Sequence, residues 1–221
     1  MNIFSYSQNF FVDFFSRIVY NVVMDKIRQP QQERSTEKKN KIIEASYEIF
    51  SEVGYYNANT SQIAKKAGVS TGIVYSYFKD KRDILLYVLK IYINKVSEPL
   101  MAYMKEVKAP LDFEKIVESL TELTIKTHRE NSHLHNTLHA LSSSDEEVNA
   151  QFESLEFHVT DKISEQLISL GVKAEGLKEK VHIAMNFIQS FAHEFVYDNH
   201  DYIDYDKMRR YVEKSIVDMF I

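Results

Sequence analysis

The hydrophobic positions of this chain follow a helical period almost throughout. One apolar stripe stops at Gly54 and consists of Ile42, Ala45, Ile49, Phe50 and Val53. Residues three and four apart lie on one face of a helix, and a following glycine favours its end. The same spacing recurs near 111–130, 133–141, 145–170, 174–198 and 205–220. Because no segment shows sustained alternation of apolar and polar residues, the pattern predicts an all-α fold.

Capping residues divide the region after Gly54 into shorter helices. Asn59 or Thr60 suits the start of a helix that runs to about Ala67, and Ser70 suits the start of one that ends at Phe78. Asp80 can cap a long fourth helix, which Pro99 is expected to end or kink.

The N-terminal stretch has three open interpretations. Residues 1–23 carry a helical apolar stripe that is too often interrupted by polar residues to span a bilayer. The first interpretation is that Met24 is the true start of the protein. The second is that the stripe docks on the body of the protein or on a partner, and the third is that it lies on a membrane surface. Residues 25–41 are polar, with Pro30, and are expected to form a flexible, basic lead-in. We expect a cytoplasmic protein, with no membrane partner.

The charge of the chain is unevenly distributed. The net charge is −5 over 221 residues, but residues 24–92 carry twelve Lys/Arg against eight Asp/Glu, and residues 93–221 carry fourteen against 23. This asymmetry predicts a basic surface at one end for an anionic partner. The absence of Cys excludes disulfides and a Cys nucleophile, and five Gly with three Pro are too few for a turn-rich all-β fold.

Residues 60–78 hold the main functional signal. Their sequence, TSQIAKKAGVSTGIVYSYF, places Gly-Val-Ser between two short helical segments. Gly68 can adopt the positive φ of a tight turn, and Val69 follows as an apolar plug. This is the pattern of a helix-turn-helix, whose second helix enters the major groove of DNA.

The expected recognition helix runs from Thr71 to Phe78. The small residues at its start, Ser70, Thr71 and Gly72, let the backbone approach the duplex, and helix N-termini favour phosphate. The hydroxyls of Tyr75 and Tyr77 have a reach suited to phosphate oxygens, and Lys79, Lys81 and Arg82 add positive charge. Phe78 is expected in the core.

Residues Ile42 to Leu89 resemble the TetR family of transcriptional regulators. The matching positions include Ala45, Phe50, Gly54, Tyr56, Thr60, Ile63, Ala64, Ala67, Gly68, Val69, Ser70, Gly72, Tyr75, Tyr77, Phe78 and Lys81. The resemblance implies three parts: an N-terminal extension over residues 1–35, disordered or a mis-called start; a helix-turn-helix DNA-binding domain over 36–82; and a helical effector-binding and dimerisation domain over 83–221.

The resemblance also implies roles for single residues. Thr60, Tyr75, Tyr77 and Lys81 would hold phosphates, and Thr71, Gly72, Ile73 and Ser76 would face base edges. The chain departs from the family at two positions: Thr71 stands where Lys or Arg is common, and Ile73 where a small polar residue is common. Since no Arg or Lys of this helix can bind guanine bidentately, the inner operator positions are expected to favour A·T.

The C-terminal half carries no motif of its own. The resemblance implies a homodimer joined through the helices near 174–198 and 205–220, and a pocket for an unidentified, mainly apolar small-molecule effector. For any one residue of such helices, packing in the core is the more common role. The candidates to line the pocket are Phe113, Leu120, His128, His135, Leu138, Phe152 and Phe187.

Four histidines fall within twelve residues of this half. His135 and His139 share a helix face as a metal pair would, and Glu130, Glu156 or His158 could complete a site. Such clusters are more often singly hydrogen-bonded, so we expect no metal and no cofactor. A metal-binding sensor that uses the His128–His139 cluster stays as an alternative.

The function that fits these features is a ligand-responsive, homodimeric repressor released from a near-palindromic operator by its effector. A DNA-binding activator or architectural factor is the alternative. An enzyme is not expected, because the chain has no Gly-rich phosphate loop and no nucleophile elbow.

Overall fold

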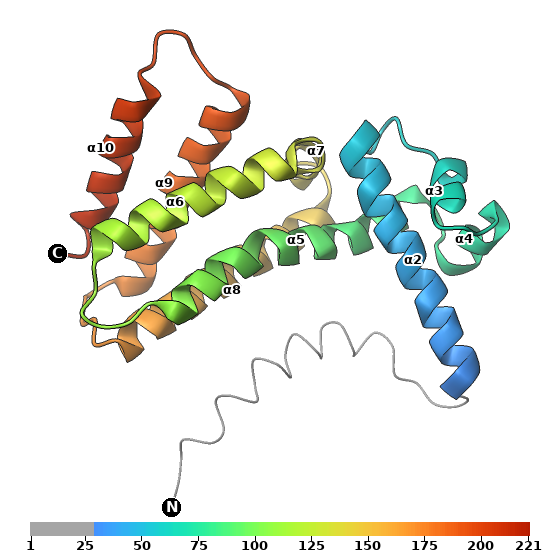
Figure 1. The fold of residues 1–221 in the computed structure, drawn as a ribbon, viewed down its shortest axis with the longest axis horizontal. Coiled ribbons are helices and arrows are strands. Elements are labelled where there is room, and N and C mark those ends of the chain that lie inside the picture. The colour runs from blue at the N-terminus through green and yellow to red at the C-terminus, as the bar shows by residue number, and fades with distance from the viewer. Residues whose placement is uncertain (1–28) are drawn as a thin grey trace, which may run out of the picture. The chain divides into compact units, whose positions relative to one another are not determined.

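The computed structural model describes residues 29–221, and every regular element in this range is an α-helix (Figure 1). The helices are α2 (Gln29–Val53), α3 (Thr60–Lys66), α4 (Thr71–Tyr77), α5 (Lys81–Glu106), α6 (Phe113–Glu130), α7 (Ser132–Ser142), α8 (Glu146–Ser169), α9 (Leu177–Tyr197) and α10 (Tyr205–Val217). The predicted all-α class is confirmed. The apolar stripe predicted for residues 1–23 lies outside the described residues.

The capping residues act where the sequence placed them. Asn59 accepts a hydrogen bond from the backbone N–H of Gln62 at the start of α3, and Gln62 returns one to Asn59 in a capping box. Ser70 caps α4 by accepting from the N–H of Ile73, and Asp80 caps α5 by accepting from the N–H of Asp83. Side-chain oxygens thus satisfy N–H groups that a helix start leaves without partners.

One boundary prediction was wrong, and one of the two outcomes predicted for Pro99 is excluded. α2 begins at Gln29, so most of the segment 25–41 is helical and not an irregular lead-in. Pro30 is compatible with this start, because the first turn of a helix needs no hydrogen bond from its N–H. α5 does not end at Pro99 but continues to Glu106, and the buried Leu100 and Met104 stabilise the part beyond the proline.

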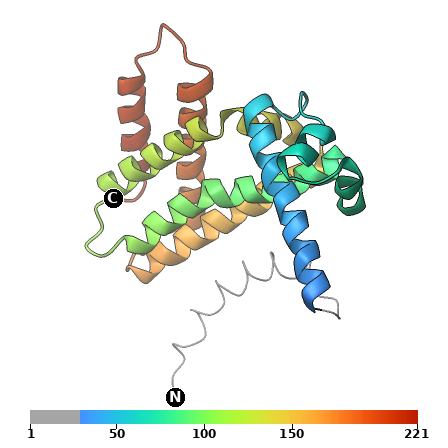
Figure 2. The same ribbon diagram turned by 45° about the vertical axis from the view of Figure 1, so that its right-hand side comes forward.

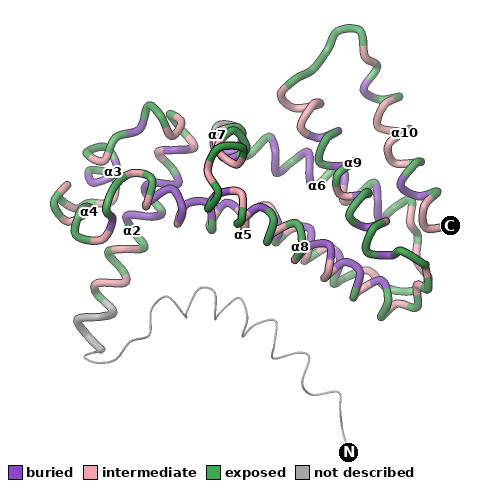
Figure 3. The backbone as a smooth tube through the Cα atoms, turned by 180° about the vertical axis from the view of Figure 1, so that it is seen from behind, coloured by how far each residue is buried: buried purple, intermediate pink, exposed green. Residues whose placement is uncertain are grey.

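Residues 41–221 form one compact unit. Its first hydrophobic core joins the end of α2 to α3, α4 and the first half of α5, with contributions from α7 and α8 (Figure 3). The fully buried side chains of this core include Ile42, Phe50, Ile63, Val74, Ile84, Leu85, Leu89, Leu134 and Leu138. The same core therefore positions the helix-turn-helix and the start of the C-terminal half.

The C-terminal helices pack in a layered arrangement of pairs. α5 lies along α8, α6 along α9, and α10 beside both α9 and α6 (Figures 1 and 2). Three smaller apolar clusters fill the spaces, centred on Ile163 of α8, Ile188 of α9 and Phe191 of α9. Within the described range, no helix is both long and apolar enough to cross a bilayer.

Two isoleucine truncations test the importance of the first core. Ile84→Ala is expected to lower the free energy of unfolding by about 2–5 kcal/mol, because it leaves a cavity in the place of a fully buried side chain. Ile168→Ala removes a side chain that is 59% exposed and should change it by less than about 0.5 kcal/mol. Denaturant unfolding curves measure both values, and similar losses for the two variants would contradict this packing.

Candidate nucleic-acid interface and effector pocket

The turn between α3 and α4 has the geometry that the sequence predicted. Gly68 has a φ of +68°, in the left-handed region that favours glycine. The N–H of Val69 then donates to the carbonyl of Ala64 at 2.9 Å, and the Val69 side chain packs against the first core. The turn thereby fixes the direction in which α4 leaves α3.

α4 has one buried face and one exposed face. Val74 is fully buried, and Phe78, which directly follows the helix, is 1% exposed, so the prediction of a core role for Phe78 is confirmed. Gly72, Tyr75 and Ser76 are exposed on the other side. The exposed face of a helix anchored in this way is free to enter a groove of DNA.

The structure of the protein alone gives no reason for glycine at position 72. Gly72 lies in the first turn of α4 without a positive φ, and an added Cβ would meet only the Ser70 hydroxyl oxygen, at 3.9 Å. An alanine would fit and would favour the helix. A glycine without such a structural role suggests that another molecule approaches the backbone here.

Several predicted contact residues already have hydrogen bonds within the protein. Thr60 Oγ1 lies 3.1 Å from the hydroxyl oxygen of Tyr75, which joins the start of α3 to the exposed face of α4. Ser76 Oγ donates to the carbonyl of Ile73 at 2.7 Å, and Ser70 Oγ accepts from the N–H of Ile73 at 3.3 Å. Thr71, Ile73 and Tyr77 are partly buried, and Ile73 and Tyr77 pack against the first core.

Lys81 has a structural role that sequence reasoning missed. Its ammonium group donates to the carbonyls of Tyr55, Tyr56 and Ala58 at 2.7, 3.4 and 2.8 Å, which ties the loop after α2 to the start of α5. Partial burial lowers the pKa of this amine. The phosphate contact predicted for Lys81 stays a prediction. To make it, the ammonium group has to give up its hydrogen bond to one of these three carbonyls.

Arg82, at the start of α5, forms an ion pair with acidic residues at the start of α8. Its guanidinium donates to both carboxylate oxygens of Asp145 at 2.7 and 2.8 Å and to Glu147 at 3.3 Å. The pair lowers the pKa of the Asp145 carboxyl and raises that of the guanidinium. The charge of Arg82 is therefore largely neutralised, and it contributes less to a DNA-binding surface than the sequence suggested.

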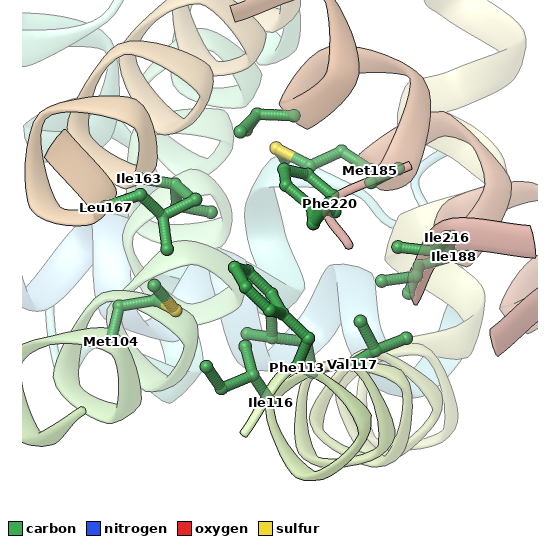
Figure 4. A pocket seen from close by; sticks show the side chains of 13 residues that line it. Met104, Phe113, Ile116, Val117, Ile163, Leu167, Met185, Ile188, Ile216 and Phe220 are labelled. Carbon is green, nitrogen blue, oxygen red and sulfur yellow. The ribbon is translucent and has the colours of Figure 1, made fainter. Parts of the chain in front are cut away.

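An entirely apolar pocket lies between the C-terminal helices (Figure 4). Its side chains come from five helices and the end of the chain: Met104, Phe113, Ile116, Val117, Leu120, Ile163, Leu167, Val181, Ala184, Met185, Ile188, Ile216 and Phe220. A second pocket shares Leu120, Ile163, Met185 and Ile188 with it and adds the polar side chains of Thr124 and Gln189. The two pockets therefore adjoin.

Only two of the seven predicted pocket residues, Phe113 and Leu120, line these pockets. Leu138 and Phe152 are buried in the first core, and Phe187 is 44% exposed on α9. His128 and His135 instead belong to a cluster of aromatic rings between α6, α7 and α9. Sequence spacing identified apolar helix faces, but not which part of each face borders a pocket.

The histidine cluster includes a residue that the sequence analysis did not consider, His193 of α9. It lies 58 residues from His135 in the sequence, so local spacing gave no signal for it. Burial lowers the pKa of His128 to about 4 and that of His135 to about 2, so both rings are neutral at pH 7.

The fold and the exposed face of α4 define a protein with a helix-turn-helix domain and a helical C-terminal half. Residues 42–88 match the family model described as "Bacterial regulatory proteins, tetR family". The HTH-type transcriptional regulator HbdR of Aromatoleum sp. (strain CIB) is 38% identical over 76 residues, which cover 34% of this chain and 33% of that protein. The fatty acid metabolism regulator protein of Bacillus subtilis (strain 168) is 42% identical over 65 residues, 29% of this chain and 34% of that protein.

The likeness of fold extends further along the chain than the likeness of sequence. A protein from Mesorhizobium loti MAFF303099, named as a TetR-family transcriptional regulator, superposes with a TM-score of 0.68 at 18% identity, over 84% of this chain and 96% of that one. The sequence matches span about a third of each curated relative's length. Over residues 42–88, the chain is therefore similar to the DNA-binding domain of the TetR family of transcriptional regulators.

Replacement of Gly72 separates folding from DNA binding. Gly72→Ala is expected to leave the free energy of unfolding unchanged or to raise it by up to about 1 kcal/mol. Its affinity for operator DNA should fall by about tenfold or more, because the methyl group occupies the space of the approaching duplex. Thermal unfolding and fluorescence anisotropy measure the two effects. Unchanged affinity would show that the duplex does not approach the backbone at position 72.

Proposed function

We propose that this protein is a homodimeric, DNA-binding repressor that a mainly apolar small molecule releases from a near-palindromic operator. The observation that carries the proposal is the exposed face of α4, where Gly72 has no structural role and polar side chains point away from the core. In a dimer, two such helices one DNA turn apart can read two half-sites together.

The proposal gives the residues of α4 and its surroundings two roles. Thr71, Gly72, Ile73 and Ser76 would read base edges, and Ile73 would offer a methyl contact to thymine at the cost of some of its packing. The hydroxyls of Thr60, Ser70, Tyr75 and Tyr77 and the ammonium of Lys81 are the groups proposed for phosphate contacts, which position the protein without specifying sequence.

The charge near α4 is smaller than a count of basic residues suggests. Lys66 forms ion pairs with Glu48 and Glu52 at 2.8 and 2.7 Å. Lys65 and Lys79 are exposed and add positive charge near the face. Hydroxyls and helix N-terminal amides therefore carry much of the proposed phosphate binding, and the affinity should depend only moderately on salt.

The proposed dimer interface lies on α9 and α10. Ile183 and Phe187 of α9 are 41% and 44% exposed, and their spacing of four places them on one face. Tyr211 of α10 is 71% exposed. The opposite face of α9, with Val181, Ala184 and Ile188, is buried within the subunit. A second copy of the chain would cover the exposed apolar side chains.

The two adjoining pockets suggest an effector with an alkyl portion and one polar group. The lining of the first pocket is entirely apolar, so it suits a hydrocarbon chain. Gln189 of the second pocket offers its side-chain amide, and Thr124 Oγ1, which donates to the carbonyl of Leu120 at 2.8 Å, can still accept a hydrogen bond. A medium-chain fatty acid such as decanoate has this combination and serves as a test ligand.

α5 provides the proposed path from effector to DNA. Met104, near its C-terminal end, lines the pocket, and Ile84 and Leu85, at its N-terminal end, share a core with α4. A ligand that binds one position of α5 better than another shifts the population toward that position. The two α4 helices of the dimer would then no longer match the spacing of the half-sites.

The wild-type protein should bind a duplex from the region upstream of its own coding sequence in preference to a scrambled duplex at moderate salt. Tyr75→Phe should weaken binding to both duplexes, because it removes a phosphate contact worth about 1.5–3 kcal/mol. Thr71→Ala should change the preference at one base pair by about 1 kcal/mol. Fluorescence anisotropy titrations with duplexes that differ by single bases measure these affinities. If Tyr75→Phe and Thr71→Ala change them in the same way, the division into phosphate-contacting and base-reading residues is contradicted.

Filling the pocket should abolish the response to the test ligand. Decanoate is expected to raise the melting temperature of the wild type and to lower its operator affinity. Ile163→Trp fills the pocket and should remove both effects. Ile168→Trp, on the same helix but 59% exposed in the wild type, should retain them. Equal responses from the two variants in thermal shift and anisotropy assays would locate the effector elsewhere.

A further inference from the structure

Three histidines from three different helices meet inside the C-terminal half. His128 of α6 and His135 of α7 are buried, and His193 of α9 is partly exposed. One ring nitrogen of each lies within 4.8 Å of one ring nitrogen of both others. Nε2 of His135 and Nδ1 of His193 lie 3.2 Å apart.

We propose that His128, His135 and His193 bind one divalent transition-metal ion of the zinc type. Neutral imidazole is a preferred ligand of Zn²⁺, Co²⁺, Ni²⁺ and Cu²⁺, and three protein ligands with a water in the fourth position form a recognised class of zinc site. The proposal depends on these side chains alone and is independent of the proposed operator and effector.

The outward nitrogen of each ring has its own partner. His128 Nδ1 donates to the carbonyl oxygen of Thr124 at 2.9 Å, and this fixes a tautomer in which Nε2 carries the lone pair. His135 Nδ1 lies 2.6 Å from the hydroxyl oxygen of Tyr92, and His193 Nε2 lies 3.4 Å from a carboxylate oxygen of Asp198. Metal-binding histidines almost always have such a partner on the nitrogen that does not bind the metal.

The spacing of the inner nitrogens is close to what a metal requires. Zn–N bonds of about 2.0–2.1 Å in a tetrahedral site place ligand nitrogens about 3.3 Å apart. The His135–His193 pair has this separation already, and the three inner nitrogens all lie within 4.8 Å of one another, so only small movements of the side chains are required. His193 can contribute to these movements, because its side chain is 40% exposed and lies near the end of α9.

Metal binding replaces one hydrogen bond of the cluster. His193 Nδ1 accepts from His135 Nε2 when His193 Nε2–H points to Asp198. For His135 Nε2 to bind the metal, its proton moves to Nδ1, where the Tyr92 oxygen accepts it. The ring remains neutral throughout, so the exchange needs no change in its net charge.

Cobalt provides the direct test with the full-length protein. Purified protein freed of metal by a chelator is titrated with Co²⁺, and we expect the visible absorption of tetrahedral Co²⁺ to saturate at one ion per chain and to disappear on addition of Zn²⁺. His193→Gln should lose this absorption. His182→Gln, an exposed histidine on the same helix, should keep it and serves as the matched control.

A second pair of variants tests Asp198, the partner of His193 Nε2, without disturbing the core. Asp198 is exposed, so Asp198→Asn should fold as the wild type does while its affinity for Co²⁺ falls about 10- to 100-fold. Asp201→Asn, three residues away and also exposed, should bind as the wild type does. Circular dichroism confirms that each variant is folded.

Three results would overturn the site. The first is a wild-type protein that develops no tetrahedral Co²⁺ absorption, which would leave the cluster as a hydrogen-bonded core. The second is unchanged binding by a folded His193→Gln variant. The third is an equal loss of binding in His182→Gln, which would indicate adventitious binding by surface histidines.

Discussion

The burial of Val74 and Phe78 in a core shared with α5 is the constraint on which the proposed activity depends. α4 has only seven residues, and a helix of that length is not stable on its own in water. Its exposed face therefore exists only while Val74 and Phe78 stay buried in the core that also contains Ile84 and Leu85 of α5. Phe78, directly after α4, meets the ring of Tyr87 of α5 edge to face with centroids 5.5 Å apart, so we expect a change in the position of α5 to move α4 as well.

α5 connects the helix-turn-helix, the histidine cluster and the apolar pocket. Its first residue, Lys81, holds the carbonyls of the loop after α2, and Arg82 is paired with Asp145 at the start of α8. Further along, Tyr92 meets His135 of the histidine cluster, and Met104 lines the apolar pocket. A ligand in the pocket and a metal ion in the cluster would thus act on the same helix, at different distances from α4.

The local features of the fold were predictable from the sequence because they depend on neighbouring residues. The caps at Asn59, Ser70 and Asp80 and the turn at Gly68 follow from the conformations those residue types favour. The continuation of α5 through Pro99 was not predictable in this way, because burial of side chains beyond the proline outweighs the local cost.

The partners of charged and polar side chains were the features that sequence could not supply. Arg82 looked available for DNA, yet its partner Asp145 lies 63 residues away. His193 joins His135 across 58 residues, and nothing in the local pattern connects them. The pocket lining also depends on which side of each apolar stripe faces the gap between helices, and this is set by packing angles that a helical period does not contain.

Hydrogen–deuterium exchange of the full-length protein, with and without DNA from its own upstream region, tests the central claim most directly. The account predicts that this DNA slows exchange of the backbone amides in residues 59–77, because the short helices α3 and α4 become covered, and that scrambled DNA at the same salt concentration does so far less. Unchanged exchange in residues 59–77, in the presence of DNA that the protein demonstrably binds, would contradict the claim that α4 is the reading helix.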